Sequence, residues 1–262
     1  MHVVGYSEPV NCELSYDDLV QHIYTLPRLP DAIPYITSYY KKKWGFCISQ
    51  NEFNTLPKQG TYKVVIESEL KPGSLTYGEY ILNGESEDEI LVSSYLCHPS
   101  MANNELSGPL TLSFLYKLIA AIPNRKYTYR FVIAPETIGT IAYLSENKND
   151  ILKHVKGGFV LTCCGTDRPF VYKKSRQSVS QTDLIAEHIL KHSKKPYSII
   201  DFDPIGSDER QYCSPGFNLA IGSVMRSKYH EYVEYHTSLD NKNLISFDAL
   251  VDTIEMYLKM IQ

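Results

Sequence analysis

Three short stretches of this 262-residue chain carry side chains of the kinds that bind metals or move protons. The first places His98 and several polar residues up to Glu105 after an apolar run, the second places Glu136 after Pro135, and the third places His236 in a polar loop. Two imidazoles and a carboxylate from three separate loops are typical of a catalytic zinc site with an open coordination position. In such a site Glu136 would act as general base toward a water molecule that the metal activates.

Each of these side chains also has an ordinary structural explanation. A single histidine at the end of a strand commonly makes structural hydrogen bonds. Glu136 would stabilise the start of a helix predicted near Gly139 through its negative charge. The prediction of a site therefore depends on the conjunction of the three stretches.

A fourth charged stretch follows Gly206 and contributes Asp208, Glu209 and Arg210. We expect these three residues to bind substrate together with Arg176 and Tyr235, with Arg210 or Arg176 recognising an anionic sugar or a carboxylate. The alternative is a solvated turn with a local ion pair, which would contribute little to stability.

A thiol nucleophile is a further alternative, because Cys97 adjoins His98 and the pair Cys163–Cys164 ends another predicted strand. Adjacent residues of a strand point to opposite faces of the sheet. Cys97 and His98 are therefore predicted to be poorly placed to share a proton unless the loop turns, and this geometry disfavours thiol chemistry.

The elements that must position these side chains begin near Ser86, where the pattern changes to alternating strands and helices. The predicted strands cover residues 89–97, 127–134, 159–164, 170–172, 197–202 and 219–224, and the predicted helices cover 107–122, 139–147, 182–192 and 246–262. This alternation indicates an α/β fold with a mixed, mainly parallel sheet. Ligands of such sheets bind beyond the carboxyl ends of the strands, where His98, Glu136 and the segment Thr162–Cys164 are all expected, with Glu136 beside His98.

Residues 1–85 lack the regular alternation of strands and helices and are predicted to form a small α+β subdomain. The α/β domain is predicted to follow over 86–262. Ser15 is a good N-cap for a short helix ending near Leu26. Strands are predicted near 46–49, 61–68 and 73–84. The opening residues 2–10 already have a strand pattern, so the chain is expected to begin in the middle of a fold.

The composition excludes several classes of protein. A net charge of −4 without a large basic cluster predicts no basic surface of the kind that binds the phosphates of nucleic acid. No run of about 18 apolar residues predicts a membrane span, and the N-terminus lacks the layout of a signal peptide. The six cysteines lack CxxC spacing, and several lie in apolar runs, which favours reduced thiols and a cytoplasmic protein.

Seven motifs together resemble the aminopeptidase-like proteins of bacterial polysaccharide-biosynthesis gene clusters, a branch of the zinc-dependent exopeptidase superfamily. They are HVVGYS (2–7), LPDAIPY (29–35), SLTYGE (74–79), CHPSMANNELSG (97–108), PETIG (135–139), SDERQ (207–211) and YHTSLD (235–240). The resemblance covers most of the chain and implies a three-layer α/β/α fold of the zinc-exopeptidase type. Members of that family extend further upstream, so the resemblance also implies a shortened form that lacks an N-terminal piece.

The resemblance assigns His98 and His236 as the first and last zinc ligands and Glu136 as the general base. Three carboxylate positions of the classical zinc aminopeptidases have changed: the bridging carboxylate falls on Asn104, the second glutamate on Thr137, and a later aspartate near Thr162 or Cys163. A neutral amide binds zinc poorly and cannot bridge two cations. We therefore expect one zinc ion at most, held by His98, Asn104 and His236, with Glu105 or Asp208 as alternative ligands that would complete its coordination. A metal-free protein is the competing expectation.

Two functions follow as hypotheses from these residues. The first is a metal-dependent hydrolase that cuts an amide bond in a small peptide or an amino-sugar derivative during surface polysaccharide biosynthesis. The second is a non-catalytic binding or scaffold protein that kept the aminopeptidase-like fold and lost metal ligands. Neither nucleic acid nor membrane is an expected partner, and a homo-oligomer is left open.

Overall fold

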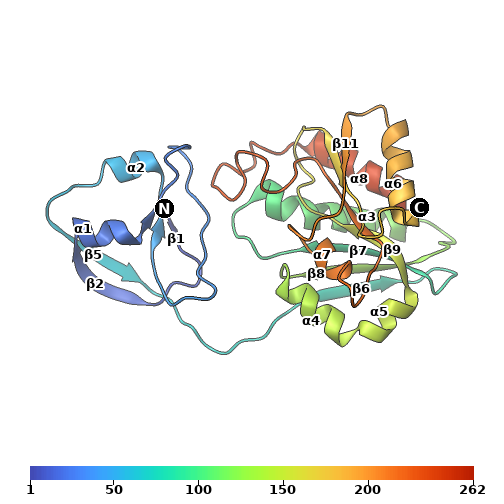
Figure 1. Cartoon of the computed structure of the whole chain (residues 1–262), viewed down its shortest axis with the longest axis horizontal. Coiled ribbons are helices and arrows are strands. Elements are labelled where there is room, and N and C mark those ends of the chain that lie inside the picture. Colours follow the sequence, from blue (N-terminus) through green and yellow to red (C-terminus); the bar gives the residue numbers. More distant parts are fainter. The chain divides into compact units, whose positions relative to one another are not determined.

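The computed structural model describes residues 1–262, which form two compact units (Figure 1). The first unit contains Met1–Ser74 together with His236–Asp240, and the second contains Leu75–Tyr235 and Asn241–Gln262. The boundary predicted at residue 85 falls inside the second unit, because a strand that precedes this boundary pairs within the second unit's sheet.

The first unit combines two small sheets with short helices, as expected for an α+β subdomain. Its elements are β1 (His2–Val3), β2 (Val10–Ser15), α1 (Tyr16–Leu19), a 3-10 turn (Val20–His22), β3 (Ile23–Tyr24), β4 (Phe46–Cys47), α2 (Gln50–Asn54) and β5 (Thr61–Ile66). The Ser15 side chain accepts a hydrogen bond from the Asp18 amide and starts α1, as predicted. The helix ends earlier than the predicted Leu26, because β3 leaves the helical path and pairs with β4.

The second unit is built on a seven-stranded mixed sheet with the order β11-β10-β12-β9-β7-β8-β6. The strands are β6 (Gly78–Leu82), β7 (Glu89–Tyr95), β8 (Thr128–Ala134), β9 (Val155–Val160), β10 (Phe170–Lys173), β11 (Tyr197–Ile200) and β12 (Ile221–Met225). The central strands β8, β7, β9 and β12 are parallel to one another, whereas β6 and β10 run antiparallel to their neighbours β8 and β12.

Helices cover both faces of this sheet and make three layers. One face carries α3 (Ser107–Ala120), α6 (Gln181–His192) and α8 (Phe247–Ile261), and the other carries α4 (Ile138–Glu146), α5 (Lys148–His154) and α7 (Glu209–Tyr212) (Figure 1). A separate hydrophobic core lies on each side, because the buried strands present apolar side chains to both faces. This arrangement confirms the predicted α/β/α fold with a mixed, mainly parallel sheet.

The sheet also determines where the predicted chemical groups lie. β7 pairs with β8 on one side and with β9 on the other, all in parallel. Their carboxyl ends are therefore adjacent, and the segments that follow them begin near Leu96, Pro135 and Leu161.

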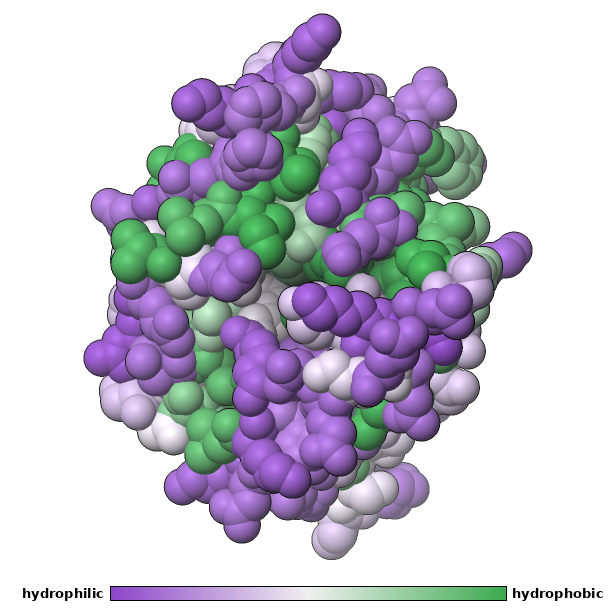
Figure 2. Space-filling model, turned by 90° about the vertical axis from the view of Figure 1, so that its right-hand side faces the viewer, coloured by the Kyte–Doolittle hydropathy of each residue, from purple (hydrophilic) through white to green (hydrophobic).

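Figure 2 shows hydrophobic areas interleaved with hydrophilic side chains on one face of the molecule. On α3, the side chains of Leu110, Phe114 and Leu118 are exposed at intervals of four residues. None of the helices is long and apolar enough to cross a membrane.

Candidate functional site

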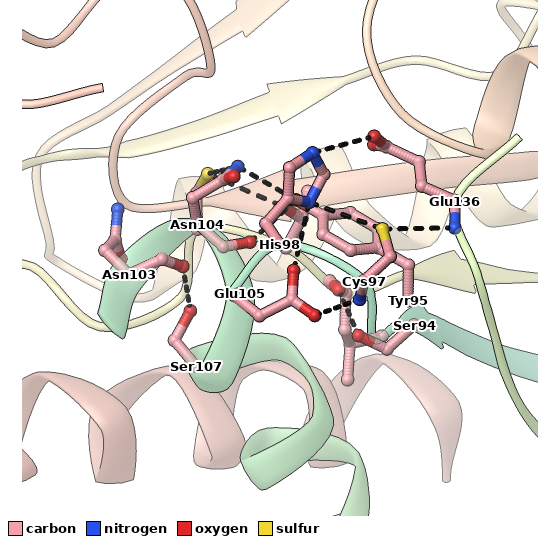
Figure 3. A network of polar contacts seen from close by, with 12 residues as sticks. Ser94, Tyr95, Cys97, His98, Asn103, Asn104, Glu105, Ser107 and Glu136 are labelled. Atoms are coloured by element: carbon pink, nitrogen blue, oxygen red, sulfur yellow. Dashed lines mark hydrogen bonds and ion pairs between the residues drawn. The ribbon is translucent and has the colours of Figure 1, made fainter. Parts of the chain in front are cut away.

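The loop after β7 folds back on itself through a π-helix, Ala102–Leu106. Pro99 prevents the strand from continuing, and the Leu106 amide then donates to the Met101 carbonyl at 3.3 Å, which closes the wider turn. The turn buries three consecutive polar side chains, Asn103–Glu105. A short irregular helix thereby directs the Glu105 carboxylate toward His98 (Figure 3).

The His98 imidazole lies between two carboxylates. Its Nδ1 is 3.0 Å from Glu105 Oε2, and its Nε2 is 3.7 Å from Glu136 Oε2 (Figure 3). The other oxygen of Glu105 accepts a hydrogen bond from the Cys97 amide, so this carboxylate is held at both ends. Glu105 therefore fixes the orientation of the ring and directs Nε2 toward Glu136, as outer carboxylates do for metal-binding histidines.

The pKa values of both groups are displaced by this arrangement. Burial of the imidazole lowers its pKa, but the contacts with Cys97 and Glu105 outweigh burial and raise the pKa of His98 to about 10. Burial also raises the pKa of Glu136, against the lowering effect of the His98 charge. A raised carboxylate pKa brings Glu136 closer to the range in which a general base exchanges protons near neutral pH.

Cys97 does not lie where the strand geometry placed it. The chain turns after β7, so Cys97 Sγ is 3.4 Å from His98 Nδ1 and accepts a hydrogen bond from the Glu136 amide at 3.4 Å. Cys97 and His98 were expected to be poorly placed to share a proton unless the loop turns, and the loop does turn, because strand alternation no longer applies once the strand has ended at Tyr95. Glu105 Oε2 contacts the same imidazole nitrogen, Nδ1, at 3.0 Å, a shorter distance than the 3.4 Å from Cys97 Sγ.

The positions where the resemblance calls for further metal-binding carboxylates hold neutral groups bonded to other protein groups. The Asn104 amide donates to the Tyr95 hydroxyl at 3.0 Å, and that hydroxyl lies 2.7 Å from Thr162 Oγ1. Thr137 Oγ1 accepts a hydrogen bond from the Arg210 guanidinium at 2.7 Å. A guanidinium at this position repels a cation, so these residues do not fit a two-metal centre.

A single cation fits the arrangement better. Because Nδ1 is held by Glu105, a metal would bind His98 through Nε2, the nitrogen that faces Glu136, and would replace a proton there. The predicted ligands Asn104 and His236 remain predictions. Glu105, considered as an alternative ligand, instead contacts Cys97 and His98.

His236 belongs to the first compact unit, whereas His98 and Glu136 belong to the second, so the pairing of the two histidines stays a prediction. Within its own unit, the His236 carbonyl accepts a hydrogen bond from the Tyr35 amide at 2.9 Å. The two rings meet edge to face with centroids 5.6 Å apart. His236 also has a positive φ of 53°, so it sits in a tight turn of the chain.

The predicted substrate-binding residues occupy different environments. Asp208 and Glu209 are fully buried, and both bind groups of the protein, Thr137 and Lys173 respectively. Burial and the nearby charge of Glu136 raise the pKa of Asp208 to about 8. A substrate contact of these two carboxylates stays a prediction.

Two further predicted substrate-binding residues, Arg176 and Tyr235, lie in loops of the second unit. Arg176 is exposed after β10, and Tyr235 is half-buried with its ring against those of His230 and Tyr232.

One buried charge at this side of the sheet was missed in the sequence. Lys173 is inaccessible to solvent and binds Glu209 Oε1 at 2.9 Å and the Tyr229 hydroxyl at 2.8 Å. The available signal was its position at the end of the apolar segment Phe170–Tyr172, since a lysine at the end of a buried strand needs a counter-charge.

Three comparisons place the chain among known proteins. The sequence family described as a domain of unknown function, DUF4910, matches residues 20–262. A protein of Clostridium acetobutylicum, provisionally named as a polysaccharide biosynthesis protein with an aminopeptidase-like domain, is 47% identical over 261 residues. That match covers 100% of this chain and 59% of the relative, so the chain spans less than two thirds of the relative's length.

Solved structures show the same fold. A crystal structure from Clostridium acetobutylicum, provisionally named as a peptidase, superimposes with a TM-score of 0.96 at 46% identity and covers 99% of this chain and 61% of its own. A zinc aminopeptidase from Bacillus subtilis superimposes with a TM-score of 0.68 at 14% identity and covers 91% of this chain and 62% of its own. The second similarity concerns the fold alone.

Proposed function

Because the chain belongs to the DUF4910 family and has an aminopeptidase-like fold, we propose that it carries a metal-dependent hydrolase site for amide bonds. The substrate would be a small peptide or an amino-sugar derivative used in polysaccharide biosynthesis. The name of the Clostridium acetobutylicum relative supports the biosynthetic context. The fold shared with zinc aminopeptidases supports zinc as the metal.

One observation carries the proposal: His98 is oriented by Glu105 through Nδ1 and directs Nε2 toward Glu136. A histidine with only a structural role has no need of a second carboxylate opposite its other nitrogen. The pair instead combines a metal-binding nitrogen with a base that is partly exposed, at 23% of its side-chain surface. This exposure lets Glu136 reach a substrate or a water molecule.

In this proposal each residue has a separate task. His98 would hold a single zinc ion through Nε2, and zinc, when bound, polarises a carbonyl and lowers the pKa of water. Glu136 would accept a proton from the attacking water and deliver it to the leaving amine. Glu105 would keep His98 in the tautomer that binds metal.

The proposal is tested by metal content and hydrolysis measured on the same preparations. We expect protein purified without chelator to contain about one metal ion per chain, and His98→Ala to lose it. Glu136→Gln should retain the metal but hydrolyse aminoacyl p-nitroanilides and aminoacylated amino sugars roughly 100-fold to 10,000-fold more slowly. His154→Ala, a half-buried histidine at the end of α5, serves as the matched control and should change neither quantity.

Two results would contradict the proposal. Substoichiometric metal that is unaffected by His98→Ala, with no hydrolysis by the wild type, would favour the non-catalytic binding or scaffold protein. Loss of hydrolysis in Cys97→Ser with full metal content would instead assign the chemistry to the thiol, which lies close to His98.

A further inference from the structure

The segment directly after Glu136 has an unusual backbone. Thr137 has φ 65° and ψ −71°, and the Ile138 amide donates to the Glu136 carbonyl at 2.8 Å. This combination defines a γ-turn centred on Thr137, in the rare form with positive φ. A β-branched residue seldom adopts this conformation, so the surrounding structure must hold it there.

Two residues of the charged stretch 207–210 contact this turn directly. The Thr137 amide donates to Asp208 Oδ1 at 2.7 Å, and Arg210 Nη2 donates to Thr137 Oγ1 at 2.7 Å. The Thr137 carbonyl accepts from the Ile141 amide at 2.9 Å in the first turn of α4. Each polar group of Thr137 therefore has a partner, and two of the three come from residues 208 and 210.

The contacting segment is itself fixed by a buried ion pair. Glu209, between the two contacting residues, binds Lys173 of β10 at 2.9 Å and the Tyr229 hydroxyl at 2.8 Å. Lys173 Nζ also donates to the Ile205 carbonyl at 2.7 Å, just before the stretch begins. Because both charges are fully buried, displacing the segment would leave an unpaired charge in the interior, which is strongly unfavourable.

The geometry points to Asp208 and Arg210 as positioning residues that hold the Thr137 γ-turn and thereby fix Glu136 relative to His98. Glu136 is anchored before the turn by its amide, which donates to Cys97 Sγ at 3.4 Å (Figure 3), and after it by the turn. A general base must lie within hydrogen-bond reach of the proton that it removes, and small displacements cost large factors in rate. The inference rests on the proposed function, in which Glu136 is that base.

The first test measures the turn without reference to activity. We expect Asp208→Ala to accelerate hydrogen exchange of the Thr137 amide by at least about 10-fold, because the amide loses its acceptor. Asp208→Asn keeps an acceptor oxygen at the same position and should exchange at a rate near that of the wild type. Unchanged exchange in Asp208→Ala would overturn the inference, whether or not the protein hydrolyses any substrate.

The second test uses hydrolysis of aminoacyl p-nitroanilides by the metal-loaded chain. Asp208→Ala should lower kcat by about 10-fold to 100-fold with little change in KM or metal content, and Asp208→Asn should restore most of the rate. Asp248→Ala, which removes an exposed carboxylate on α8, is the control and should retain full activity. Loss of metal in both Asp208 variants would assign Asp208 to the metal and overturn the positioning role.

A third variant separates positioning from general destabilisation. Glycine adopts positive φ without steric cost, so Thr137→Gly should reduce the dependence of the turn on its contacts. Asp208→Ala should then lower kcat less in the Thr137→Gly background than in the wild type. Equal effects of Asp208→Ala on kcat in both backgrounds would contradict the inference. If the wild type shows no hydrolysis, the proposed function is contradicted, and hydrogen exchange of the Thr137 amide alone then decides whether Asp208 holds the turn.

Discussion

At the scale of single residues, the orientation of His98 depends on a carboxylate seven positions later in the chain. Glu105 reaches the imidazole only because the π-helix turns it inward, and both of its oxygens are then used, one on the Cys97 amide and one on His98 Nδ1. An imidazole held in this way has a defined proton position and ring angle. The identity of His98 alone would not have distinguished a metal ligand from a structural residue.

We predict that Glu105→Gln weakens metal binding without removing it. The amide keeps the shape of the side chain but loses the negative charge that makes the imidazole a better ligand, so zinc affinity should fall by roughly 10-fold to 100-fold. Competition with a chromogenic chelator measures this change. Glu255→Gln, at an exposed position of α8, provides the comparison, and equal affinities for the two variants would show that Glu105 does not act through His98.

At the scale of elements, α6 shows how a helix start can stabilise the interior. Ser180 and Asp183 form a capping box, and Asp183 also accepts hydrogen bonds from the Tyr172 hydroxyl at 2.7 Å and from the Ser175 amide at 2.7 Å. These bonds join the helix to β10 and to the loop that follows it. The motif was not recognised in the sequence, although Ser180 with Asp183 three residues later is a capping pattern.

Asp183 is predicted to make stability depend on pH at the acid side. Burial raises the pKa of Asp183, but the hydrogen bonds from Ser175, Ser180 and Tyr172 outweigh burial, and the net pKa is lowered. A lowered folded-state pKa contributes stability above the unfolded value of about 3.9, and this contribution is lost as pH falls through the folded-state pKa. Asp183→Asn should therefore cost about 1.5–3 kcal/mol at pH 7, and the difference from wild type should shrink toward pH 2.

Urea unfolding followed by circular dichroism at several pH values measures this difference. Asp248→Asn, on the exposed face of α8, should show no comparable effect. A constant difference between Asp183→Asn and wild type at every pH would mean that the ionised form of Asp183 is not the one that stabilises the fold.

At the scale of the whole molecule, one buried charge joins several elements of the second unit. Arg130 of β8 is 2% exposed and forms ion pairs with Glu89 of β7, Glu79 of β6 and Asp150 of α5. It also donates to the Tyr143 hydroxyl on α4 at 3.2 Å. The network therefore connects three neighbouring strands of the sheet with the helical layer beside them.

We predict that Arg130→Met destabilises the second unit by about 3–5 kcal/mol, because it leaves the Glu89 carboxylate buried without its counter-charge. The double variant Arg130→Met/Glu89→Leu should recover much of this loss, since it removes both charges together. Urea denaturation of the wild type, Arg130→Met, Glu89→Leu and the double variant measures the coupling. Additive losses in the double variant would show that the two side chains contribute independently.

The α/β fold class and most elements of the second unit were predictable from the sequence, because hydrophobic periodicity along the chain reflects burial on a sheet or beneath a helix. The predicted strand and helix at 127–134 and 182–192 closely match β8 and α6. Pro99 and Pro135 indicated where two strands end, and the parallel pairing of β7 with β8 then placed His98 and Glu136 side by side. The short α7 and the π-helix were not predicted, since elements of four or five residues carry no periodic signal.

Residue types and spacing alone therefore determined that His98 and Glu136 lie at the carboxyl edge of an α/β sheet. The hydrophobic pattern of a strand and the proline that ends it are both properties of neighbouring residues. Only the tertiary structure decided what each side chain contacts. The Glu105 carboxylate contacts the His98 imidazole, and the Cys97 thiol lies beside the same ring. The Arg210 guanidinium donates a hydrogen bond to the Thr137 hydroxyl. Such contacts depend on loop conformation and on pairings across dozens of residues, and these are set by packing and by the need to satisfy buried polar groups rather than by sequence separation.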